Sequence, residues 1–328
     1  MLKVVLLRNN VTPKNKFGGI RKHCQELYEL FIGNSTISIL PIIDIPNLYI
    51  PILRKRIFRW KALYYYLKDS GCNIVHIHGF ATLDVAQAII AAAFAKKRIV
   101  YSPHFHPFKY LRRPLLGKIY FYGCLRFLFR YISAIITITS VDANFFARYH
   151  KHVYKVPHLF DEDRAEITSK LPKKKNMILF VGRNEENKGL FHLMNLDPKY
   201  EVHLVTNGIV GRKDFIVHTN ISNEALDALY EQTSLVVIPS RYEAFSYVAL
   251  EAFAHGTPVV MSDTVMIADY LRGIKGFSTF TFGDEQAFLK AVDETIGTNV
   301  ETEKILSIFS KEKIKNQYTH IYLKAGSL

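Results

Sequence analysis

Short apolar runs alternate with helical patterns along almost the whole chain, and this alternation restricts the fold more than any other feature. In the first half, strand-like runs rich in Val and Ile occur at residues 3–8, 35–43, 73–79, 98–104 and 134–140. Apolar residues at helical spacing lie between them, as at Leu83, Ala86, Ile90 and Ala93. Alternating strands and helices are typical of βαβ units in a parallel sheet, so we predict an α/β fold.

The alternation begins again after a polar linker at residues 161–175. Beyond it we predict strands at 176–183, 201–208, 234–240 and 257–263, helices at 189–195, 223–232 and 246–255, and a charged amphipathic helix at 310–325. Two such halves predict two facing, doubly wound, Rossmann-like domains with a cleft between them. We place these domains at residues 1–160 and 161–308, followed by a terminal helix at 309–328.

The composition fits a globular protein and argues against several other classes. The 328 residues are 49% hydrophobic and 22% charged, which is ordinary for a globular chain. Cys24, Cys72 and Cys124 stand far apart, which predicts reduced thiols rather than disulfides. The first residues resemble a buried strand more than a signal peptide, and no apolar run approaches the ~20 residues of a membrane span. We therefore expect a cytoplasmic protein.

Residues 239–260, PSRYEAFSYVALEAFAHGTPVV, place two acids in a strand–loop–helix context. Glu243 follows a buried strand, at the end where open α/β sheets bind ligands. Glu251 lies eight residues later in an otherwise apolar helix, where a carboxylate is costly unless it is paired. A ribose diol could pair with it, and the amides of Phe245, Ser246 and Tyr247 at the helix start could bind an anion. A helix-capping role would explain Glu243 alone, and a salt bridge would explain Glu251 alone. The two acids together indicate a ligand site.

Two further loops have residues that suit phosphate groups. In FVGRNEENKGL, residues 180–190, Arg183 and Lys188 follow the end of a strand, where a guanidinium and an ammonium suit a diphosphate. Gly18 and Gly19 precede the first helix and permit close approach of the backbone to a phosphate or a sugar. A solvated turn is the alternative interpretation for both loops.

Histidines follow two of the predicted strands. His104 and His106 lie at the end of the strand at 98–104, and we predict a substrate contact there. His76 and His78 alternate on one face of another strand; no carboxylate or cysteine accompanies them nearby, so we predict packing for His76 and cleft lining for His78. The chain contains no zinc signature, and we predict no metal site.

Several of these segments together resemble a known family. They are GGI…H…L near the start, IVHIHG, SPH, VGR…KG and EAFSYVALEAFAHGTPVV. They resemble the retaining enzymes of glycosyltransferase family 4, which have the GT-B fold, and the last segment resembles the E-x7-E motif of that family. The resemblance extends to the C-terminal helix, which in this family crosses back onto the N-terminal domain.

The resemblance implies a role for most of the candidate residues. The N-terminal domain would bind the acceptor, and the C-terminal domain would bind a UDP- or GDP-sugar donor without a metal or other cofactor. The donor diphosphate would contact Arg183 and Lys188, the ribose would contact Glu251, and the transferred sugar would contact Glu243 near the reacting carbon.

His104 would contact a sugar hydroxyl, and Gly18 and Gly19 would lie by the phosphates. The chain departs from the family at Ala244 and Ser246, where glycine is usual. Because both positions lie where backbone amides approach the donor, the departures put the choice of sugar in question.

Positive charge is concentrated in the first half of the chain. The formal net charge is +14, and residues 45–141 hold fifteen Lys and Arg but only two acids, Asp69 and Asp84. Basic and aromatic residues gather at 54–68 and 109–131, where Lys118, Tyr122, Arg126 and Arg130 recur every four residues. This pattern suits peripheral contact with an anionic membrane, while a core helix with a solvated face explains it equally well. No nucleic-acid-binding motif accompanies the charge, so we do not expect nucleic acid as a partner.

We therefore predict a retaining hexosyltransferase that moves a sugar from a nucleotide-diphosphate sugar to a lipid-linked, glycan or other acceptor. Two alternatives stay open. One is a nucleotide-sugar epimerase or phosphorylase on the same fold, and the other is a non-catalytic basic protein that binds membranes or nucleic acid.

Overall fold

The computed structural model describes residues 1–8, 19–40, 47–50, 55–80, 82–104, 115–160, 171–208 and 211–327. Two compact units make up the chain: an N-terminal unit of Met1–Leu159 with Glu312–Leu328, and a second unit of Phe160–Lys311. The predictions for Gly18, His106, the linker at 161–170 and the first part of the segment 109–131 fall on residues outside the described part.

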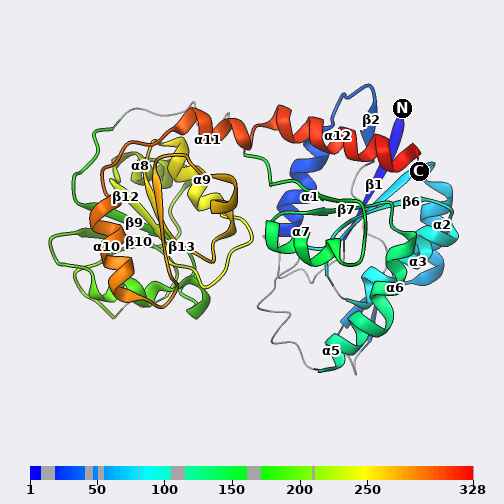
Figure 1. The fold of residues 1–328 in the computed structure, drawn as a ribbon, viewed down its shortest axis with the longest axis horizontal. Coiled ribbons are helices and arrows are strands. Elements are labelled where there is room, and N and C mark those ends of the chain that lie inside the picture. Colours follow the sequence, from blue (N-terminus) through cyan, green and yellow to red (C-terminus); the bar gives the residue numbers. More distant parts are fainter. Residues whose placement is uncertain are drawn as a thin grey trace. The chain divides into compact units, whose positions relative to one another are not determined.

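The N-terminal unit contains a six-stranded parallel sheet in the order β2-β1-β5-β6-β7-β8 (Figure 1). Its strands are rich in Val and Ile because both faces of the sheet are covered by helices. The chain order reverses between β1 and β5. The strands are β1 (Leu2–Arg8), β2 (Ile37–Ile39), β5 (Ile74–His78), β6 (Arg98–Ser102), β7 (Ala134–Thr137) and β8 (Val153–Lys155).

Each face of this sheet packs on its own apolar core. On one face lie α2 (Trp60–Asp69), α3 (Leu83–Phe94), α7 (Ser140–Ala147) and a helical segment formed by α5 (Leu115–Tyr120), η1 (Phe121–Leu125), α6 (Arg126–Leu128) and η2 (Phe129–Tyr131). On the other face lie α1 (Gly19–Leu30) and the final helix α12 (Lys311–Ser327). α12 contributes Ile314, Tyr318, Ile321, Tyr322 and Ala325 to this core.

Two local features of this unit differ from the sequence prediction. The segment 54–68 includes β4 (Lys55–Phe58), which pairs antiparallel with β3 (Asn47–Ile50), before α2 begins. In the segment 109–131, η1 is a π-helix, so a spacing of four residues does not hold one face along the whole segment. Lys118 is accordingly half-buried, while Tyr122, Arg126 and Arg130 are exposed.

The second unit contains a six-stranded parallel sheet in the order β11-β10-β9-β12-β13-β14. The two sheets together confirm the prediction of doubly wound α/β architecture. The strands are β9 (Met177–Val181), β10 (Glu201–Val205), β11 (Ile216–His218), β12 (Leu235–Ile238), β13 (Val259–Ser262) and β14 (Phe277–Phe280).

Helices cover both faces of this second sheet as well. One core includes side chains of α8 (Asn223–Gln232), α9 (Tyr247–Ala254), η6 (Met266–Tyr270) and α11 (Thr302–Ile308). The other includes side chains of η5 (Leu190–Asn195), which follows η4 (Glu186–Lys188), and of α10 (Glu285–Thr295). Within the described ranges, no helix combines the length and apolar content that crossing a membrane requires.

Candidate functional site

The residues that sequence analysis singled out in the second unit lie where the strand order of its sheet reverses. β9 and β12 are neighbours in the sheet, although β10 and β11 lie between them in the chain. Open α/β sheets usually bind ligands at the carboxyl ends of the strands at such a position. Arg183 and Lys188 follow β9, and Glu243 follows β12.

These two loops are joined by close backbone contacts. Gly189 has a φ of +69°, and a Cβ added there would lie 1.8 Å from the carbonyl oxygen of Pro239. The Arg241 amide donates a hydrogen bond to the Asn187 carbonyl at 2.8 Å. Because a side chain at position 189 would push the loops apart, glycine at this position lets Lys188 reach Glu243.

Lys188 and Glu243 form an ion pair between the loops that follow β9 and β12. Lys188 Nζ lies 2.7 Å from Glu243 Oε1, and the Ser240 hydroxyl donates to the same oxygen at 2.7 Å. Both side chains are mostly buried but retain some exposure, 24% for Lys188 and 14% for Glu243. A partly buried, hydrogen-bonded ion pair holds a positive and a negative group within reach of a polar ligand.

The backbone around Glu243 is held from β13. The Ser262 and Thr264 hydroxyls both donate to the Ser240 carbonyl, and the Glu243 amide donates to the Thr264 carbonyl at 3.2 Å. These bonds fix the loop that carries Glu243 on the more rigid sheet.

The helix that follows begins with a capped turn. Ser246 is the N-cap of α9, and its hydroxyl accepts a hydrogen bond from the Ala249 amide at 3.4 Å. The Ser246 side chain is therefore buried and turned toward its own helix. Phe245 and Tyr247 flank it, and their rings are in edge contact.

Glu251 and Arg183 have partners of their own. Glu251 lies in α9 and accepts a hydrogen bond from the Tyr230 hydroxyl at 3.0 Å. Arg183 is largely exposed and pairs with Glu185 at 2.8 Å, so it lies on the rim of the loop rather than in the Lys188–Glu243 pair. The structure thus brings Lys188 and Glu243 together and leaves Arg183 apart from them.

In the N-terminal unit, five histidines gather around the carboxyl ends of β5 and β6. They come from α1, β5, the loop after β6 and the segment after β8, and are His23, His76, His78, His104 and His158. The first helix begins at Gly19, four residues before His23. His78 is buried beneath His104, so it reaches the edge of the sheet through His104 rather than by lining a cleft itself.

Burial keeps these imidazoles neutral. It lowers the pKa of His76 to about 3, of His104 to about 4 and of His158 to about 3. Burial, and secondarily the neighbouring histidines, hold the pKa values of His23 and His78 well below the ordinary value. Neutral imidazoles act as hydrogen-bond donor and acceptor at once.

The hydrogen bond between His78 and His104 favours one arrangement of protons. His78 Nδ1 lies 3.0 Å from His104 Nε2, and the buried Nε2 of His78 has no hydrogen-bond partner among the described residues. A buried N–H without a partner is rarer than an unused acceptor, so the proton of His78 belongs on Nδ1. His104 then accepts at Nε2 and carries its own proton on Nδ1, ready to donate to a ligand oxygen. His104 also has a φ of +45°, an uncommon conformation for a residue other than glycine.

Tyrosines of α12 complete this cluster. His76 Nδ1 lies 2.8 Å from the Tyr322 hydroxyl and its Nε2 lies 2.8 Å from the Ser102 hydroxyl. The Tyr318 hydroxyl lies 3.2 Å from His23 Nε2. α12 therefore supports the histidines directly, in addition to filling the core.

Among the described residues, two groups of side chains could each offer three metal ligands. One is His23, His78 and His104, and the other is His23, Glu26 and His158, with ligand atoms within 4.8 Å of one another. The first group includes the histidine pair described above, whose facing nitrogens already share a hydrogen bond.

Family models match both halves of the chain. Residues 21–164 match the model described as Glycosyltransferase Family 4, and residues 161–312 match the model described as Glycosyl transferases group 1. The chain belongs to the family 4 glycosyltransferases. The resemblance seen in the sequence is thereby confirmed, and so is the expectation of a glycosyltransferase.

Individual relatives of this glycosyltransferase include an uncharacterized protein and a named mannosyltransferase. An uncharacterized 41.2 kDa protein in the cps region of Klebsiella pneumoniae is 25% identical over 78% of this chain and 80% of its own length. The MMP alpha-(1->4)-mannosyltransferase of Mycolicibacterium hassiacum is 30% identical over 47% of this chain and 43% of its own. The structure of HepE from Anabaena, solved with UDP-glucose, is 15% identical and matches with a TM-score of 0.69 over all of both chains. This likeness confirms the GT-B fold.

Several residues around these sites were not identified from the sequence of this glycosyltransferase. They are Gly189, Tyr230, Ser240, His23, Tyr318 and Tyr322. The spacing of Tyr318 and Tyr322 on one helical face was a usable signal, because buried tyrosines usually bond through their hydroxyls. The partners of Gly189, Tyr230 and His23 depend on contacts between distant segments, whereas Ser240 bonds to Glu243 within its own loop.

Proposed function

We propose that this chain is a retaining hexosyltransferase that uses a UDP- or GDP-sugar as its donor. The observation that carries the proposal is the Lys188–Glu243 pair at the point where the strand order of the second sheet reverses. Solved relatives support the nucleotide, since HepE was solved with UDP-glucose. The alpha-(1->4) linkage named for the mannosyltransferase relative agrees with retention of the anomeric configuration.

The donor is proposed to bind through the candidate residues of the second unit. Lys188 neutralises the diphosphate, and Arg183 leaves its exposed partner Glu185 to join it. The amides of Phe245, Ser246 and Tyr247 bind phosphate or sugar oxygens at the start of α9. Glu251, oriented by Tyr230, accepts the ribose hydroxyls, and Glu243 contacts the transferred sugar.

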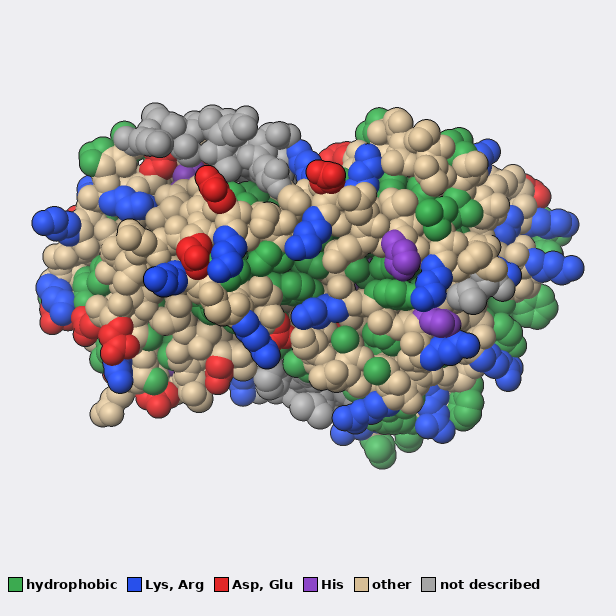
Figure 2. Space-filling view, turned by 45° about the horizontal axis from the view of Figure 1, so that its top comes forward, with side chains coloured by type: hydrophobic (Ala, Val, Ile, Leu, Met, Phe, Trp, Pro, Cys, Tyr) green, Lys and Arg blue, Asp and Glu red, His purple; other side chains and the backbone are tan. Residues whose placement is uncertain are grey.

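We propose that the N-terminal unit binds the acceptor. We also propose that His104 and the backbone at Gly18 and Gly19 contact the donor. The Nδ1–H of His104 donates to a sugar hydroxyl, and the backbone at Gly18 and Gly19 lies by the phosphates. The proposed acceptor is anionic, lipid-linked or a glycan, because the unit is strongly basic. The segments 54–68 and 109–131 are proposed to contact an anionic membrane. Figure 2 shows Lys and Arg side chains, with few acidic ones among them, over the N-terminal unit on the right of the view.

The proposed transfer occurs on one face of the sugar. A bond forms between the acceptor hydroxyl oxygen and the anomeric carbon while the bond from that carbon to the diphosphate oxygen breaks. The hydroxyl proton passes to the departing diphosphate, whose charge Lys188 and Arg183 stabilise. No metal is required in this scheme, because these cations neutralise the leaving group.

Two variants that each lack one cation test whether Lys188 and Arg183 bind the donor diphosphate. Lys188→Ala and Arg183→Ala should each lower turnover of the donor by about 10²-fold, the usual loss when one group that stabilises developing charge is removed. Release of UDP or GDP from a panel of nucleotide sugars measures it. Arg272→Ala, which removes an exposed Arg of the same unit, is the matched control and should retain full activity.

Product analysis completes the test. We expect an axial linkage retained from the donor, and full activity in EDTA. An inverted linkage would refute retention, loss of activity in EDTA would refute the metal-free scheme, and epimerised donor without transfer would favour the epimerase alternative.

A further inference from the structure

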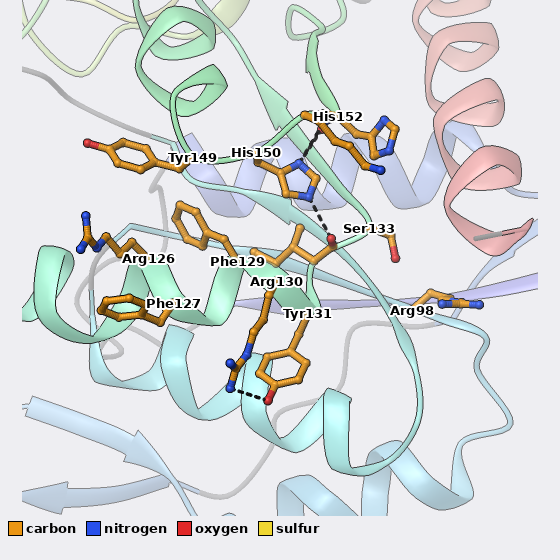
Figure 3. Close-up of a pocket in the computed structure, with 12 residues that line it drawn as sticks. Arg98, Arg126, Phe127, Phe129, Arg130, Tyr131, Ser133, Tyr149, His150 and His152 are labelled. Atoms are coloured by element: carbon orange, nitrogen blue, oxygen red, sulfur yellow. Dashed lines mark hydrogen bonds between the residues drawn. The ribbon is translucent and has the colours of Figure 1, made fainter.

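A pocket of about 590 Å³ lies on the N-terminal unit (Figure 3), and its lining places it at the edge of the sheet opposite to the histidine cluster. Arg98 begins β6, Ser133 directly precedes β7, and His152 directly precedes β8, so the pocket is at the amino ends of these strands. His78 and His104 lie at the carboxyl ends of β5 and β6. The pocket is therefore separate from the residues assigned to sugar transfer.

The lining of this pocket is strongly basic. It includes the exposed side chains of Arg98, Arg126, Arg130 and Lys151, and no acidic residue is among the lining residues. Between residues 85 and 160 the sequence has a single acid, Asp142, which is buried. Within the described ranges, no ion pair involves these cations, so their charge is left for a ligand to neutralise.

Aromatic rings hold the two arginines of the helical segment in place. Arg126 Cζ lies 4.7 Å from the ring centroid of Phe127, and Arg130 Cζ lies 4.9 Å from that of Tyr131. Arg130 Nη2 also donates to the Tyr131 hydroxyl at 3.0 Å, as the dashed line in Figure 3 shows. Guanidinium groups that are already ordered bind phosphate oxygens with less loss of side-chain entropy.

Exposed apolar side chains lie on the helical segment that carries these arginines. Phe127 is 55% exposed and Tyr131 is 43% exposed, and both line the pocket. A free phosphate would gain nothing from such side chains, whereas a phosphate attached to acyl chains in a membrane would bury them.

We propose that this pocket binds the phosphate of an anionic phospholipid headgroup. The cations of the lining bind the phosphate oxygens, Arg126 and Arg130 from different directions (Figure 3), while the rings of Phe127 and Tyr131 enter the acyl boundary. The proposal rests on the membrane contact proposed above and gives that contact a discrete binding site. Docking here would leave the opposite, carboxyl edge of the sheet free for the acceptor.

Titration with a soluble short-chain lipid tests the pocket without a membrane surface. Dihexanoyl phosphatidic acid, kept below its micelle concentration, should bind the full chain saturably in isothermal titration calorimetry. The double variant Arg126→Gln/Arg130→Gln should weaken this binding by about tenfold or more, since each cation near a lipid phosphate contributes appreciably. The variant Lys3→Gln/Lys96→Gln removes two exposed cations of the same unit that lie outside the pocket and outside the segments 54–68 and 109–131, and it should bind as the wild type does.

Three outcomes would overturn the proposal. Equal losses in the two double variants would show that diffuse charge, not the pocket, binds the lipid. Binding of inorganic phosphate as tight as that of the lipid would refute a headgroup site. Equal binding of dihexanoyl phosphatidylcholine would refute selection for an anionic headgroup.

Vesicle sedimentation separates this proposal from the broader membrane contact. If wild-type protein sediments with phosphatidylglycerol vesicles and the Arg126→Gln/Arg130→Gln variant sediments equally, the membrane contact stands and the pocket does not. If the wild type does not sediment with these vesicles, both fail. Donor turnover measured in the same samples reports on the sugar-transfer proposal independently.

Discussion

Gly189 occupies a position that other residues can take only if two loops move apart. Its φ is +69°, and a Cβ would overlap the Pro239 carbonyl oxygen at 1.8 Å. Lys188, the residue before it, is thereby held against β12 and its loop. At the scale of single residues, the candidate donor site depends on this contact as much as on its charged groups.

Replacing this glycine should separate a clash from ordinary backbone strain. Gly189→Ala should lower the free energy of unfolding by more than about 3 kcal/mol and depress donor turnover, because the loops must move apart. Gly297 has a similar φ of +71°, but nothing lies within 4 Å of a Cβ added there, so Gly297→Ala is the matched control. It should cost only about 1 kcal/mol. Urea unfolding measures both, and equal costs would contradict the interpretation of the contact.

The buried histidines make stability depend on pH. The folded pKa values of His76 and His158, about 3 for each, lie below the ~6.5 of an exposed histidine, so the unfolded chain binds protons that the folded chain excludes. Stability should therefore fall as the pH drops below about 6.5, by about 1.4 kcal/mol per pH unit for each such histidine. Asp142 opposes this trend, because burial raises its pKa to about 7, but it is a single group.

Thermal unfolding between pH 7.5 and pH 5 measures this effect. His158→Gln should lose less stability on acidification than the wild type, because it lacks one buried imidazole. His320→Gln, at an exposed histidine of the same unit, should leave the slope unchanged. Stability that is constant or rises on acidification would show that the cluster does not exclude protons.

Among the elements, α12 combines packing with support of the histidine cluster. Its Tyr322 hydroxyl lies 2.8 Å from His76 Nδ1 at a fully buried position. Tyr322→Phe should cost about 1–3 kcal/mol, the usual cost of leaving a buried polar group without a partner. Tyr65→Phe, at a tyrosine that is 55% exposed, should change the free energy of unfolding by less than about 0.5 kcal/mol. Similar values for the two variants would mean that the hydroxyl of Tyr322 contributes nothing.

The elements also show which parts of the fold sequence patterns can predict. The Val- and Ile-rich strands at the centres of both sheets were predictable because burial on both faces requires apolar runs. The hairpin of β3 and β4 was not, because its basic and aromatic residues match no alternation. The π-helix η1 was missed because a periodicity of four residues describes only a regular helix.

The candidate site was predictable to a similar extent. Glu243 and Lys188 stood out because polar residues at strand ends are exposed to ligands. Their pairing follows from the contact of two loops distant in sequence, whereas Arg183 pairs with Glu185, two residues away in its own loop. Likewise, nothing in the local pattern around His23 indicates that four other histidines surround it.

At the scale of the whole molecule, the apolar cores of the described residues do not mix between the two units. Those of the second unit contain only residues between Phe160 and Phe309, whereas one core of the first unit takes side chains from α12. A fragment of residues 160–311 should therefore unfold cooperatively by itself. A fragment of residues 1–159 should lack a cooperative transition, because Ile314, Tyr318 and Tyr322 are missing from its core. Circular dichroism during heating measures the unfolding of both fragments. Cooperative unfolding of the fragment 1–159 would contradict the inference that its core needs side chains of α12.

The position of α12 also sets the order in which the protein can be completed during synthesis. A ribosome delivers β1 and α1 first, yet the core they line stays open until residues 312–325 have emerged. The intervening residues 160–311 can meanwhile assemble a core from their own side chains. The unit translated first is thus the last to be finished, and during that interval it exposes an apolar surface that chaperones or proteases can reach.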